Sequence, residues 1–427
     1  MKFLIQNFGC RATQADGAAL AAALEARGFQ AARGCAEADL VILNTCTVTS
    51  SADQDVRQSV RRLRRENPTA KIVLTGCYAQ RAPQEAAALP GVGLVVGNTH
   101  KMQIPELLLV EPASCDSRIF VGDIFAEQSL ALAPVLEASE DRTRPNLKIQ
   151  DGCNNRCSFC IIPSVRGRSR SAPPDQVVQQ VRELAGRYRE IVLSGVNLGR
   201  WGREAGMRMR LAGLLRRLLE DTPVERLRLS SVEPMDFSDG LLELMASTPR
   251  IAKHVHAPLQ SGSDAVLRRM RRWYRARHYA ERIRRARALM PEAAIGADVM
   301  VGFPGETEAD FEQTRALIES LPFTYLHVFT YSARPGTPAA EMPDQVPVRE
   351  RKRRNRTLRE LAAAKNLAFR QSMVGRRLSA VTIEDGRLAL STNYLKIELE
   401  QPCPPNRLVE VEIQRVTQSG LAGQVIL

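Results

Sequence analysis

Short apolar runs alternate with amphipathic segments over roughly the first 125 residues of the chain. The apolar runs are KFLIQ, DLVILN, KIVLTG and GLVVG, and helical periodicity occupies 13–27 and 51–65. Residues typical of helix starts precede these segments: Thr13 with Asp16, and Ser51 with Gln54. Strands that alternate with helices form parallel sheets with crossovers. We therefore expect an N-terminal parallel α/β domain over 1–125.

One cysteine follows each of the first three apolar runs, at Cys10, Cys46 and Cys77. Ligands of open parallel sheets gather at the carboxyl ends of the strands, so these three thiols should converge there. We interpret them as a three-thiolate site. The other unassigned cysteines have no such placement, and we expect them to be small buried hydrophobic residues. They are Cys35, Cys115 and Cys403.

A second alternating stretch begins at residue 146, after a linker over 126–145 that loses periodicity and carries prolines and a charge cluster. Six candidate strands follow, at 147–152, 190–196, 226–233, 253–260, 295–302 and 325–332. Six βα units are too few for a closed eight-stranded barrel. We expect a central partial (β/α)6 barrel over 146–370, with active-site groups at the carboxyl ends of its strands.

Three cysteines, Cys153, Cys157 and Cys160, follow the first strand of this barrel with the spacing Cys-x3-Cys-x2-Cys. A structural zinc site uses four protein ligands, and ferredoxin-type cluster motifs carry four cysteines. No fourth cysteine or histidine follows nearby. Three thiolates therefore favour a four-iron cluster with one iron left open for a small molecule.

Polar residues follow three further strands of the expected barrel. GVNLG contains Asn197, SSVEP contains Glu233 and APLQSGS contains Gln260. VGFPGET then leads into a helix with the capping-box-like pair Thr307 and Asp310. Because these groups come after successive strands, they predict a pocket for a polar cofactor.

The end of the chain changes to period two, with about five short strands after Gly375. This pattern predicts a small antiparallel β-barrel over 371–427. No apolar run reaches the length of a membrane span, and the start MKFLIQNFGC lacks an apolar signal core. We therefore expect a cytoplasmic protein with no membrane association, and its nine cysteines argue for metal or redox chemistry rather than disulfides.

The chain is strongly basic, with a formal net charge of +13. Residues 266–288 hold ten Arg against one acid, with Trp273, Tyr274 and Tyr279 interleaved, and 348–376 hold ten Lys and Arg against two Glu. Guanidinium groups beside aromatic rings neutralise phosphates and stack on exposed bases. These stretches predict RNA contact, and a solvated helix face is the competing interpretation.

The cysteine loop, with Phe159 before its last cysteine, resembles the cluster loop of radical S-adenosylmethionine (SAM) enzymes. With both cysteine triplets placed, nearly the whole chain resembles the methylthiotransferases. The segments NTCTVT, GCYAQ, LKIQDGCNNRCSFCIIPSVRGRSRS, EIVLSGVNLG and FTYSARPGTPA are most similar to the branch that modifies N6-threonylcarbamoyladenosine at position 37 of tRNA. RAT at 11–13 departs from that branch, which more often has a basic residue, Val and Asn there.

This resemblance implies two [4Fe-4S] clusters, an auxiliary one on Cys10, Cys46 and Cys77 and a SAM-binding one on the second triplet. It also implies SAM as cofactor, with Phe159, Asn197, Glu233 and Gln260 as candidate contacts. The C-terminal barrel would be an RNA-binding TRAM domain. The implied partners are the anticodon stem-loop of tRNA and an electron donor such as flavodoxin or ferredoxin.

The implied reaction replaces hydrogen at carbon 2 of adenine, an sp2 C–H that acid–base groups at ordinary pKa values do not activate. One SAM would methylate a sulfur at the auxiliary cluster, and a second would yield the 5'-deoxyadenosyl radical that activates the flipped nucleoside. Arg166, Arg168 and Arg170, just after the cysteine loop, are candidates for the anticodon-loop backbone, unless they pair with acids of the barrel.

Three alternatives stay open at this point. The first is methylthiolation of N6-isopentenyladenosine in tRNA, which an apolar pocket would favour. The second is methylthiolation of an aspartate of a small-subunit ribosomal protein. The third is a non-catalytic RNA-binding iron-sulfur protein, which would need no SAM pocket.

Overall fold

The computed structural model describes residues 1–110, 118–127, 130, 134–135, 143–204 and 206–426. The chain divides into two compact units. The first comprises Met1–Ala138, Gln150–Ser171 and Ser332–Ala340, and the second Ser139–Ile149, Ala172–Tyr331 and Glu341–Leu427. Most of the expected linker over 126–145 lies outside the described residues.

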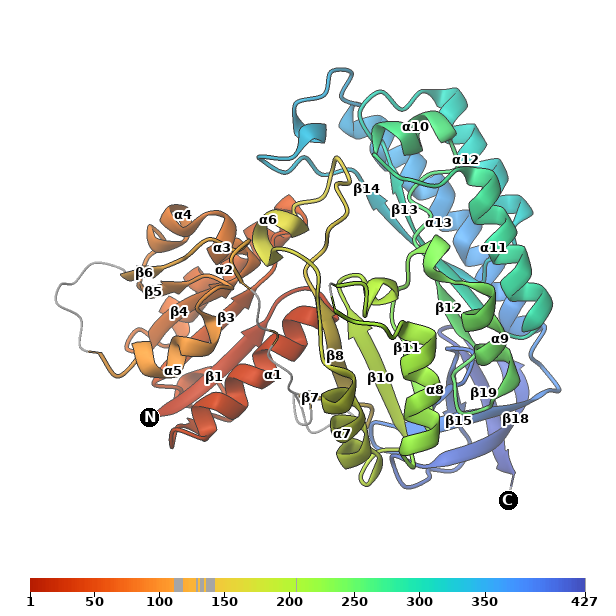
Figure 1. The fold of residues 1–427 in the computed structure, drawn as a ribbon, viewed down its shortest axis with the longest axis horizontal. Helices are drawn as coiled ribbons and strands as arrows, with labels where there is room; N and C mark the ends of the chain where they lie inside the picture. The colour runs from red at the N-terminus through yellow and green to blue at the C-terminus, as the bar shows by residue number, and fades with distance from the viewer. Residues whose placement is uncertain (111–117, 128–129, 131–133, 136–142, 205, 427) are drawn as a thin grey trace. The chain divides into compact units, whose positions relative to one another are not determined.

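The first unit is built on a six-stranded sheet with the order β2-β1-β3-β4-β5-β6 (Figure 1). All of its neighbouring strands pair in parallel, as the alternating pattern predicts. The strands are β1 (Lys2–Asn7), β2 (Gln30–Ala31), β3 (Leu40–Thr45), β4 (Lys71–Gly76), β5 (Val92–Val96) and β6 (Arg118–Phe120). The helices are α1 (Arg11–Glu25), α2 (Ser50–Glu66), α3 (Cys77–Arg81), α4 (Pro83–Ala87), α5 (Ile104–Leu107) and α6 (Ile162–Arg166). Two short strands, β7 (Pro134–Val135) and β9 (Arg170–Ser171), also lie in this unit.

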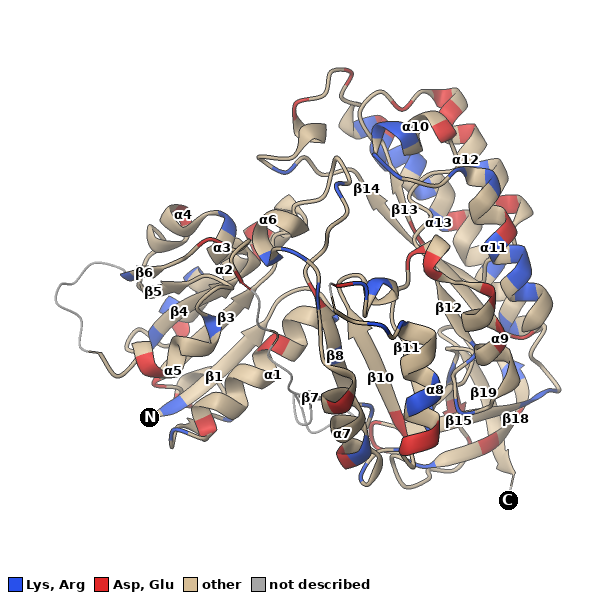
Figure 2. Cartoon of the chain, viewed as in Figure 1, with Lys and Arg blue, Asp and Glu red and all other residues tan. Residues whose placement is uncertain are grey.

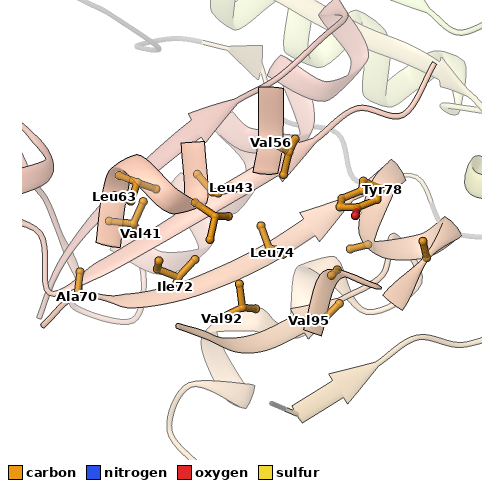
Figure 3. Packing of buried hydrophobic residues seen from close by; sticks show 14 of the residues in the cluster. Val41, Leu43, Val56, Leu63, Ala70, Ile72, Leu74, Tyr78, Val92 and Val95 are labelled. Atoms are coloured by element: carbon orange, nitrogen blue, oxygen red, sulfur yellow. The ribbon is translucent and has the colours of Figure 1, made fainter. Parts of the chain in front are cut away.

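Side chains of β3 alternate between two hydrophobic cores. Val41 and Leu43 pack with Val56 and Leu63 of α2 (Figure 3). Leu40 and Ile42 face the other side and pack with residues of α1, including Leu20 and Leu24. All six residues of β3 are buried, which is typical of a parallel strand covered on both faces.

The helix caps differ from the expected ones. Cys10 precedes α1 without a side-chain cap, so Thr13 lies inside the helix. Thr49 caps α2, because its hydroxyl accepts from the backbone N–H of Ala52 and the helix begins before Ser51. The capping box of α12 (Glu308–Ser320) is confirmed, with Thr307 and Asp310 bonded reciprocally.

The expected half-barrel strands are confirmed as β8 (Asn146–Asp151), β10 (Glu190–Gly195), β11 (Arg226–Leu229), β12 (His254–His256), β13 (Ala294–Val301) and β14 (Tyr325–Thr330). In the second unit β10 pairs with β11, and β12, β13 and β14 form a three-stranded parallel sheet. A parallel bridge between Leu227 and Ile251 joins the two groups. The boundary between the units falls within β8, after Ile149.

Helices cover one side of these strands (Figure 1). They are α7 (Pro174–Ala185), α8 (Leu211–Asp221), α9 (Asp239–Ser247), α10 (Asp264–Arg269), α11 (Ala276–Leu289), α12, and α13 (Val348–Gln371), which lies along β14. Among the described residues, no helix is long and apolar enough to cross a membrane.

The C-terminal strands close into the expected small barrel, with the order β15-β16-β17-β19-β18. They are β15 (Arg377–Ile383), β16 (Leu388–Ser391), β17 (Lys396–Leu399), β18 (Leu408–Val416) and β19 (Leu421–Ile426). Four neighbouring pairs are antiparallel, and β17 with β19 is the parallel exception that closes the barrel. The fold class read from the sequence is therefore confirmed.

A fully buried carboxylate, Glu190 on β10, helps join this barrel to the half-barrel. Arg228 donates to Glu190 Oε1 and Oε2 at 2.8 and 3.0 Å and also to the carbonyls of Ser391 and Thr392. Burial alone would raise the pKa of Glu190, but Arg228, Arg144 and Arg226 lower it to about 2. The carboxylate is therefore ionised when the unit is folded.

Replacing this carboxylate by an amide, Glu190→Gln, is expected to lower the free energy of unfolding by about 3–5 kcal/mol at neutral pH, because buried guanidinium groups lose their partner. The folded pKa is about 2 against an ordinary 4.5, so this stabilisation is present above pH 4.5 and lost as the pH falls toward 2. Urea unfolding at pH 7 and pH 3 measures the difference in free energy of unfolding between wild type and variant. If this difference is the same at both pH values, Glu190 is not an ionised partner of the buried arginines.

Candidate active site

The three N-terminal cysteines lie after neighbouring strands. Cys10 follows β1, Cys46 follows β3 and Cys77 follows β4, and these strands are adjacent in the sheet. Cys46 and Cys77 are buried, whereas Cys10 is exposed. The structure thus places these thiols at one edge of the sheet, as the sequence predicts.

Close approach of the backbone brings the first thiol to the second. Gly9 has a φ of +97°, and a Cβ there would lie 2.5 Å from Cys46 Cβ and 2.8 Å from Cys46 Sγ. A larger residue at this position would displace the cysteine. Polar side chains lie near two of the sulfurs. Thr13 Oγ1 lies 3.6 Å from Cys10 Sγ, and Asn98 Nδ2 lies 3.7 Å from Cys77 Sγ.

The environment disfavours free thiolates. Burial, together with the nearby Cys77 and Cys10, raises the pKa of the Cys46 thiol to about 12, against the opposing effects of the Val48 backbone and Arg166. Convergent thiols of this kind lose their protons when a metal centre supplies positive charge. A single zinc ion would hold its sulfurs about 3.8 Å apart, from a Zn–S length near 2.3 Å. Among the described residues no three cysteine sulfurs lie within 4.8 Å of one another, so the spacing fits a larger centre better.

A buried ion network lies beside these thiols. The Arg166 guanidinium is 2% exposed and donates to both carboxylate oxygens of Asp151 and to Asp16 of α1. Lys101 reaches the same Asp16 oxygen at 3.0 Å. Burial would lower the pKa of Arg166, but Asp151 and Asp16 raise it well above its ordinary value. The expectation that Arg166 meets RNA is therefore wrong, because two buried carboxylates hold it inside the first unit.

The second cysteine triplet lies on a loop between β8 and α6. Cys153 N–H donates to the Gly167 carbonyl, Cys160 N–H to the Cys157 carbonyl, and the Asn155 N–H lies 3.4 Å from Cys153 Sγ. All three cysteines are partly exposed. The loop therefore presents three accessible sulfurs from a backbone that is fixed at both ends.

The segment Ser332–Ala340 contacts the surroundings of both triplets inside the first unit. Arg334 is buried and pairs with Asp53 and Thr47, and Thr47 directly follows Cys46. Arg81 donates to the same Thr47 and Asp53. At its other end the segment donates from Ala339 N–H to the Ser158 carbonyl at 2.8 Å, within the second cysteine loop.

Sequence reasoning missed this set of buried charges. Its members are the buried Asp16, Asp53, Lys101, Asp151 and Arg334, together with the partly buried Arg81. Several lie inside the motif segments already singled out, such as Asp151 in the cysteine stretch and Arg334 in FTYSARPGTPA. A charged residue inside one of these motif segments was the sequence signal that could have indicated a buried ion pair.

The candidate cofactor residues of the second unit follow three successive strands, as expected. Asn197 is buried after β10, and Glu233 comes after β11 and pairs with Arg272. Gln260 comes after β12 with a left-handed φ of +62°, and its N–H donates to the Asp298 carbonyl at 2.9 Å. The pairing of Glu233 with Arg272 gives that carboxylate a structural role of its own.

The first arginine-dense stretch differs from expectation. Tyr274 and Tyr279 are 1% and 0% exposed, so they cannot stack on RNA bases. Trp273 is half exposed, and the Arg200 guanidinium lies 4.7 Å from its ring. Arg282 and Arg285 pair with acids of α9. Only part of this stretch is therefore available to a polyanion.

The second stretch forms α13 and keeps a basic surface (Figure 2). Arg353 and Arg354 pair with Glu308. Lys352, Arg356 and Arg359 line a groove with Thr330 of β14. Within the described part of the chain no salt bridge engages these three cations.

Of the remaining cysteines, Cys35 and Cys403 pack against hydrophobic cores, but they are partly exposed rather than fully buried as expected. Cys115 lies outside the described residues.

Comparison with known proteins connects both sites to one family. The radical SAM superfamily model matches residues 147–318, and the model of uncharacterized protein family UPF0004 matches residues 2–97. Threonylcarbamoyladenosine tRNA methylthiotransferase MtaB of Aquifex aeolicus is 38% identical over 97% of this chain and 100% of its own length. The chain belongs to the radical SAM methylthiotransferases. It is thus an enzyme, and the hypothesis of a non-catalytic iron-sulfur protein is set aside.

Relatives with two different substrates in their names are similar to this methylthiotransferase. MtaB of Thermotoga maritima is 36% identical over 99% of this chain and 95% of its own. The tRNA-2-methylthio-N(6)-dimethylallyladenosine synthase of Pelotomaculum thermopropionicum is 35% identical over 88% and 85%. Both are similar along most of their length.

A solved structure supports the fold of the methylthiotransferase. The radical SAM methyltransferase TsrM from Kitasatospora setae superposes with a TM-score of 0.59 at 17% identity, over 79% of this chain and 76% of that one. Enzymes of the methylthiotransferase family use [4Fe-4S] clusters and SAM, which confirms the cofactors expected from the sequence.

Proposed function

We propose that this enzyme transfers a methylthio group to carbon 2 of N6-threonylcarbamoyladenosine at position 37 of tRNA, with two molecules of SAM consumed. The observation that carries the substrate is the 38% identity to the A. aeolicus MtaB over that protein's full length. The relative from P. thermopropionicum keeps dimethylallyladenosine as a second candidate, at 35% identity over a smaller share of the chain.

The cluster ligands follow from the two cysteine sets. Cys10, Cys46 and Cys77 hold the auxiliary cluster, and Cys153, Cys157 and Cys160 hold the cluster that binds SAM. Three protein ligands leave one iron of each cluster open. When bound, the SAM cluster supplies the electron that cleaves SAM to methionine and the 5'-deoxyadenosyl radical.

The chain's own residues hold these ligands in place. Arg166 fixes α1 and the end of β8 through Asp16 and Asp151, and it lies close enough to oppose the raised pKa of Cys46. Arg334 fixes the residue after Cys46 through Thr47. Rigid support of this kind keeps reactive groups in productive geometry.

SAM is bound by Phe159 beside the cluster and by Asn197, Glu233 and Gln260 after the half-barrel strands. In this role Glu233 acts together with Arg272, its partner in the structure. A site built on strand ends positions a cofactor more firmly than mobile loops do.

The anticodon stem-loop of tRNA is bound through the C-terminal TRAM barrel and the groove of α13 that contains Lys352, Arg356 and Arg359. Cations without acidic partners are the ones available to neutralise phosphates. An electron donor of the flavodoxin or ferredoxin kind supplies the reducing equivalent.

The test is mass spectrometry of tRNA nucleosides from a strain that lacks the gene. We expect 2-methylthio-N6-threonylcarbamoyladenosine to disappear, with its precursor N6-threonylcarbamoyladenosine accumulating, while the isopentenyl analogue is unchanged. Complementation with the wild-type gene serves as the control. Loss of the isopentenyl analogue instead would overturn the assignment. If neither modified nucleoside is lost, tRNA is not supported as the substrate.

A further inference from the structure

A histidine-rich cluster of side chains on β12, β13 and β14 is separate from the residues proposed to bind the iron–sulfur clusters or SAM. Three of the five histidines of the chain lie on these strands, at His254, His256 and His327. Asp298 of β13 pairs directly with His327 in the sheet register. The ligand atoms of His256, Asp298 and His327 all lie within 4.8 Å of one another.

Asp298 is the centre of this cluster. Its Oδ1 lies 3.3 Å from His256 Nε2 and 3.3 Å from His327 Nδ1. Burial would raise the pKa of Asp298, but hydrogen bonds from the two imidazoles lower it well below its ordinary value. The carboxylate thus lies within ion-pair distance of both imidazole rings and presents an acceptor to each of them.

The cluster faces the open side of the sheet. On β14, Val328 is buried, whereas the His327 side chain is 55% exposed and Phe329 is 45% exposed. Side chains alternate along a strand, and α13 lies along β14, with Asn355 bonded to the Val328 carbonyl. His327 therefore points away from α13, toward the opposite face of the sheet.

Aromatic rings support the cluster from the side. The Tyr325 hydroxyl lies 2.6 Å from His254 Nε2, and His254 stacks at 4.3 Å on Tyr394 of the C-terminal barrel. The Tyr325 ring lies over Gly296, where a Cβ would come within 2.0 Å of it. These contacts hold the Tyr325 ring in place, and the centroids of the His256 and His327 rings lie 5.8 and 5.4 Å from it.

The cluster also lies next to the candidate SAM site. Gln260 follows His256 by four residues, and its backbone N–H donates to the carbonyl of Asp298. A nucleoside that reacts with a radical formed from SAM must bind close to SAM. His327 is the most exposed member of the cluster and is therefore the one available to such a substrate.

The chemistry of the ring indicates the kind of group that it recognises. Nδ1 of His327 faces Asp298, which leaves Nε2 to the ligand. A ring with a hydrogen on each nitrogen donates to Asp298 through Nδ1 and to the ligand through Nε2. A carboxylate meets this requirement, whereas an isopentenyl group offers nothing to a polar ring and would leave it unsatisfied.

We propose that the His256–Asp298–His327 cluster recognises the carboxylate of the threonylcarbamoyl group through His327, and so distinguishes this substrate from an isopentenyl-bearing one. The inference rests on the proposed function. In this inference His327 selects the substrate, while the iron–sulfur and SAM sites carry out the radical chemistry.

The experiment compares the reconstituted wild-type enzyme with His327→Phe on two tRNAs, one with threonylcarbamoyl and one with isopentenyl at N6. We expect kcat/KM for the threonylcarbamoyl substrate to fall about 10- to 150-fold, the range for a lost charged hydrogen bond, while 5'-deoxyadenosine formation without tRNA changes less than about twofold. His327→Gln keeps a donor and should recover part of the preference. His278→Phe, a histidine outside the cluster, should leave the ratio of the two kcat/KM values unchanged.

Three results would overturn the inference. In the first, wild type prefers the threonylcarbamoyl substrate and His327→Phe keeps that preference. In the second, the holoenzyme binds one equivalent of Zn²⁺ whose X-ray absorption shows only nitrogen and oxygen ligands, and Asp298→Asn abolishes this binding; the cluster is then a metal site, since two histidines and one carboxylate also suit such ions. In the third, wild type modifies only the isopentenyl substrate, which refutes the proposed function as well.

Discussion

Replacing Cys46 by alanine is expected to abolish methylthio transfer while SAM cleavage continues. Cys46 belongs to the N-terminal triplet, which lies after β1, β3 and β4, whereas Cys153, Cys157 and Cys160 lie on a separate loop. Loss of a side chain that only orients a metal ligand costs about 10- to 100-fold in metal affinity or activity. Loss of a ligand should exceed this, so we expect less than about 1% of the wild-type methylthiolation rate.

The measurement separates the two activities. Chromatography of the reduced, reconstituted variant should show 5'-deoxyadenosine at the wild-type rate, and mass spectrometry of its tRNA product should show no methylthio group. Cys35→Ala is the matched control, because Cys35 lies in the same unit and packs against a hydrophobic core. A Cys46→Ala variant with full methylthiolation would remove Cys46 from the ligand set.

Substitution of the buried Arg166 by methionine is expected to destabilise the first unit strongly. Arg166 joins Asp16 to Asp151, residues that are far apart in the sequence, and all three are less than a tenth exposed. Removing one partner of a buried ion pair costs about 3–5 kcal/mol, because the remaining charges stay desolvated. We expect the free energy of unfolding of the first unit to fall by this amount.

Urea denaturation followed by circular dichroism measures this effect. Arg168→Met is the control, since Arg168 is exposed two residues away and a surface substitution changes stability by about 0.5 kcal/mol or less. Arg166→Lys keeps a charge but has one nitrogen in place of the two that bond Asp151 and Asp16, and should lie between wild type and Arg166→Met. Equal stability of Arg166→Met and Arg168→Met would show that the network contributes nothing.

The positions of the two cysteine sets could be predicted from the sequence for a physical reason. Each of Cys10, Cys46 and Cys77 follows an apolar run, and in a parallel sheet the ends of such runs meet at one edge. Strand pairing of this kind follows from local periodicity. The same holds for the small barrel, where period two and closely spaced turns specify short strands.

The buried ion pairs could not be predicted in this way. Asp16 and Arg166 are 150 residues apart, and nothing local distinguishes a buried arginine from one that meets RNA. The prediction that Tyr279 contacts RNA could have been avoided. Tyr279, Ile283 and Ala286 follow helical spacing and share the buried face of α11. The cap at Thr49 was missed because Ser51 lies only two residues away and offers the same hydroxyl chemistry.

The His256–Asp298–His327 cluster could not be predicted from the sequence either. His256, Asp298 and His327 come from three strands, and each was part of a run that was interpreted as strand alone. Alternation along β14 places His327 opposite the buried Val328, but which face stays open depends on the packing of α13. Only the three-dimensional structure brings these side chains together.

The central claim is that two separate three-cysteine sites each hold a four-iron cluster. The most direct test is the iron content per chain after anaerobic reconstitution, measured for wild type, for Cys10, Cys46 and Cys77 changed together to alanine, and for Cys153, Cys157 and Cys160 changed together. We expect about eight irons in wild type and about four in each variant, with SAM cleavage retained only in the first variant. About four irons in wild type, or eight in either variant, would contradict the claim.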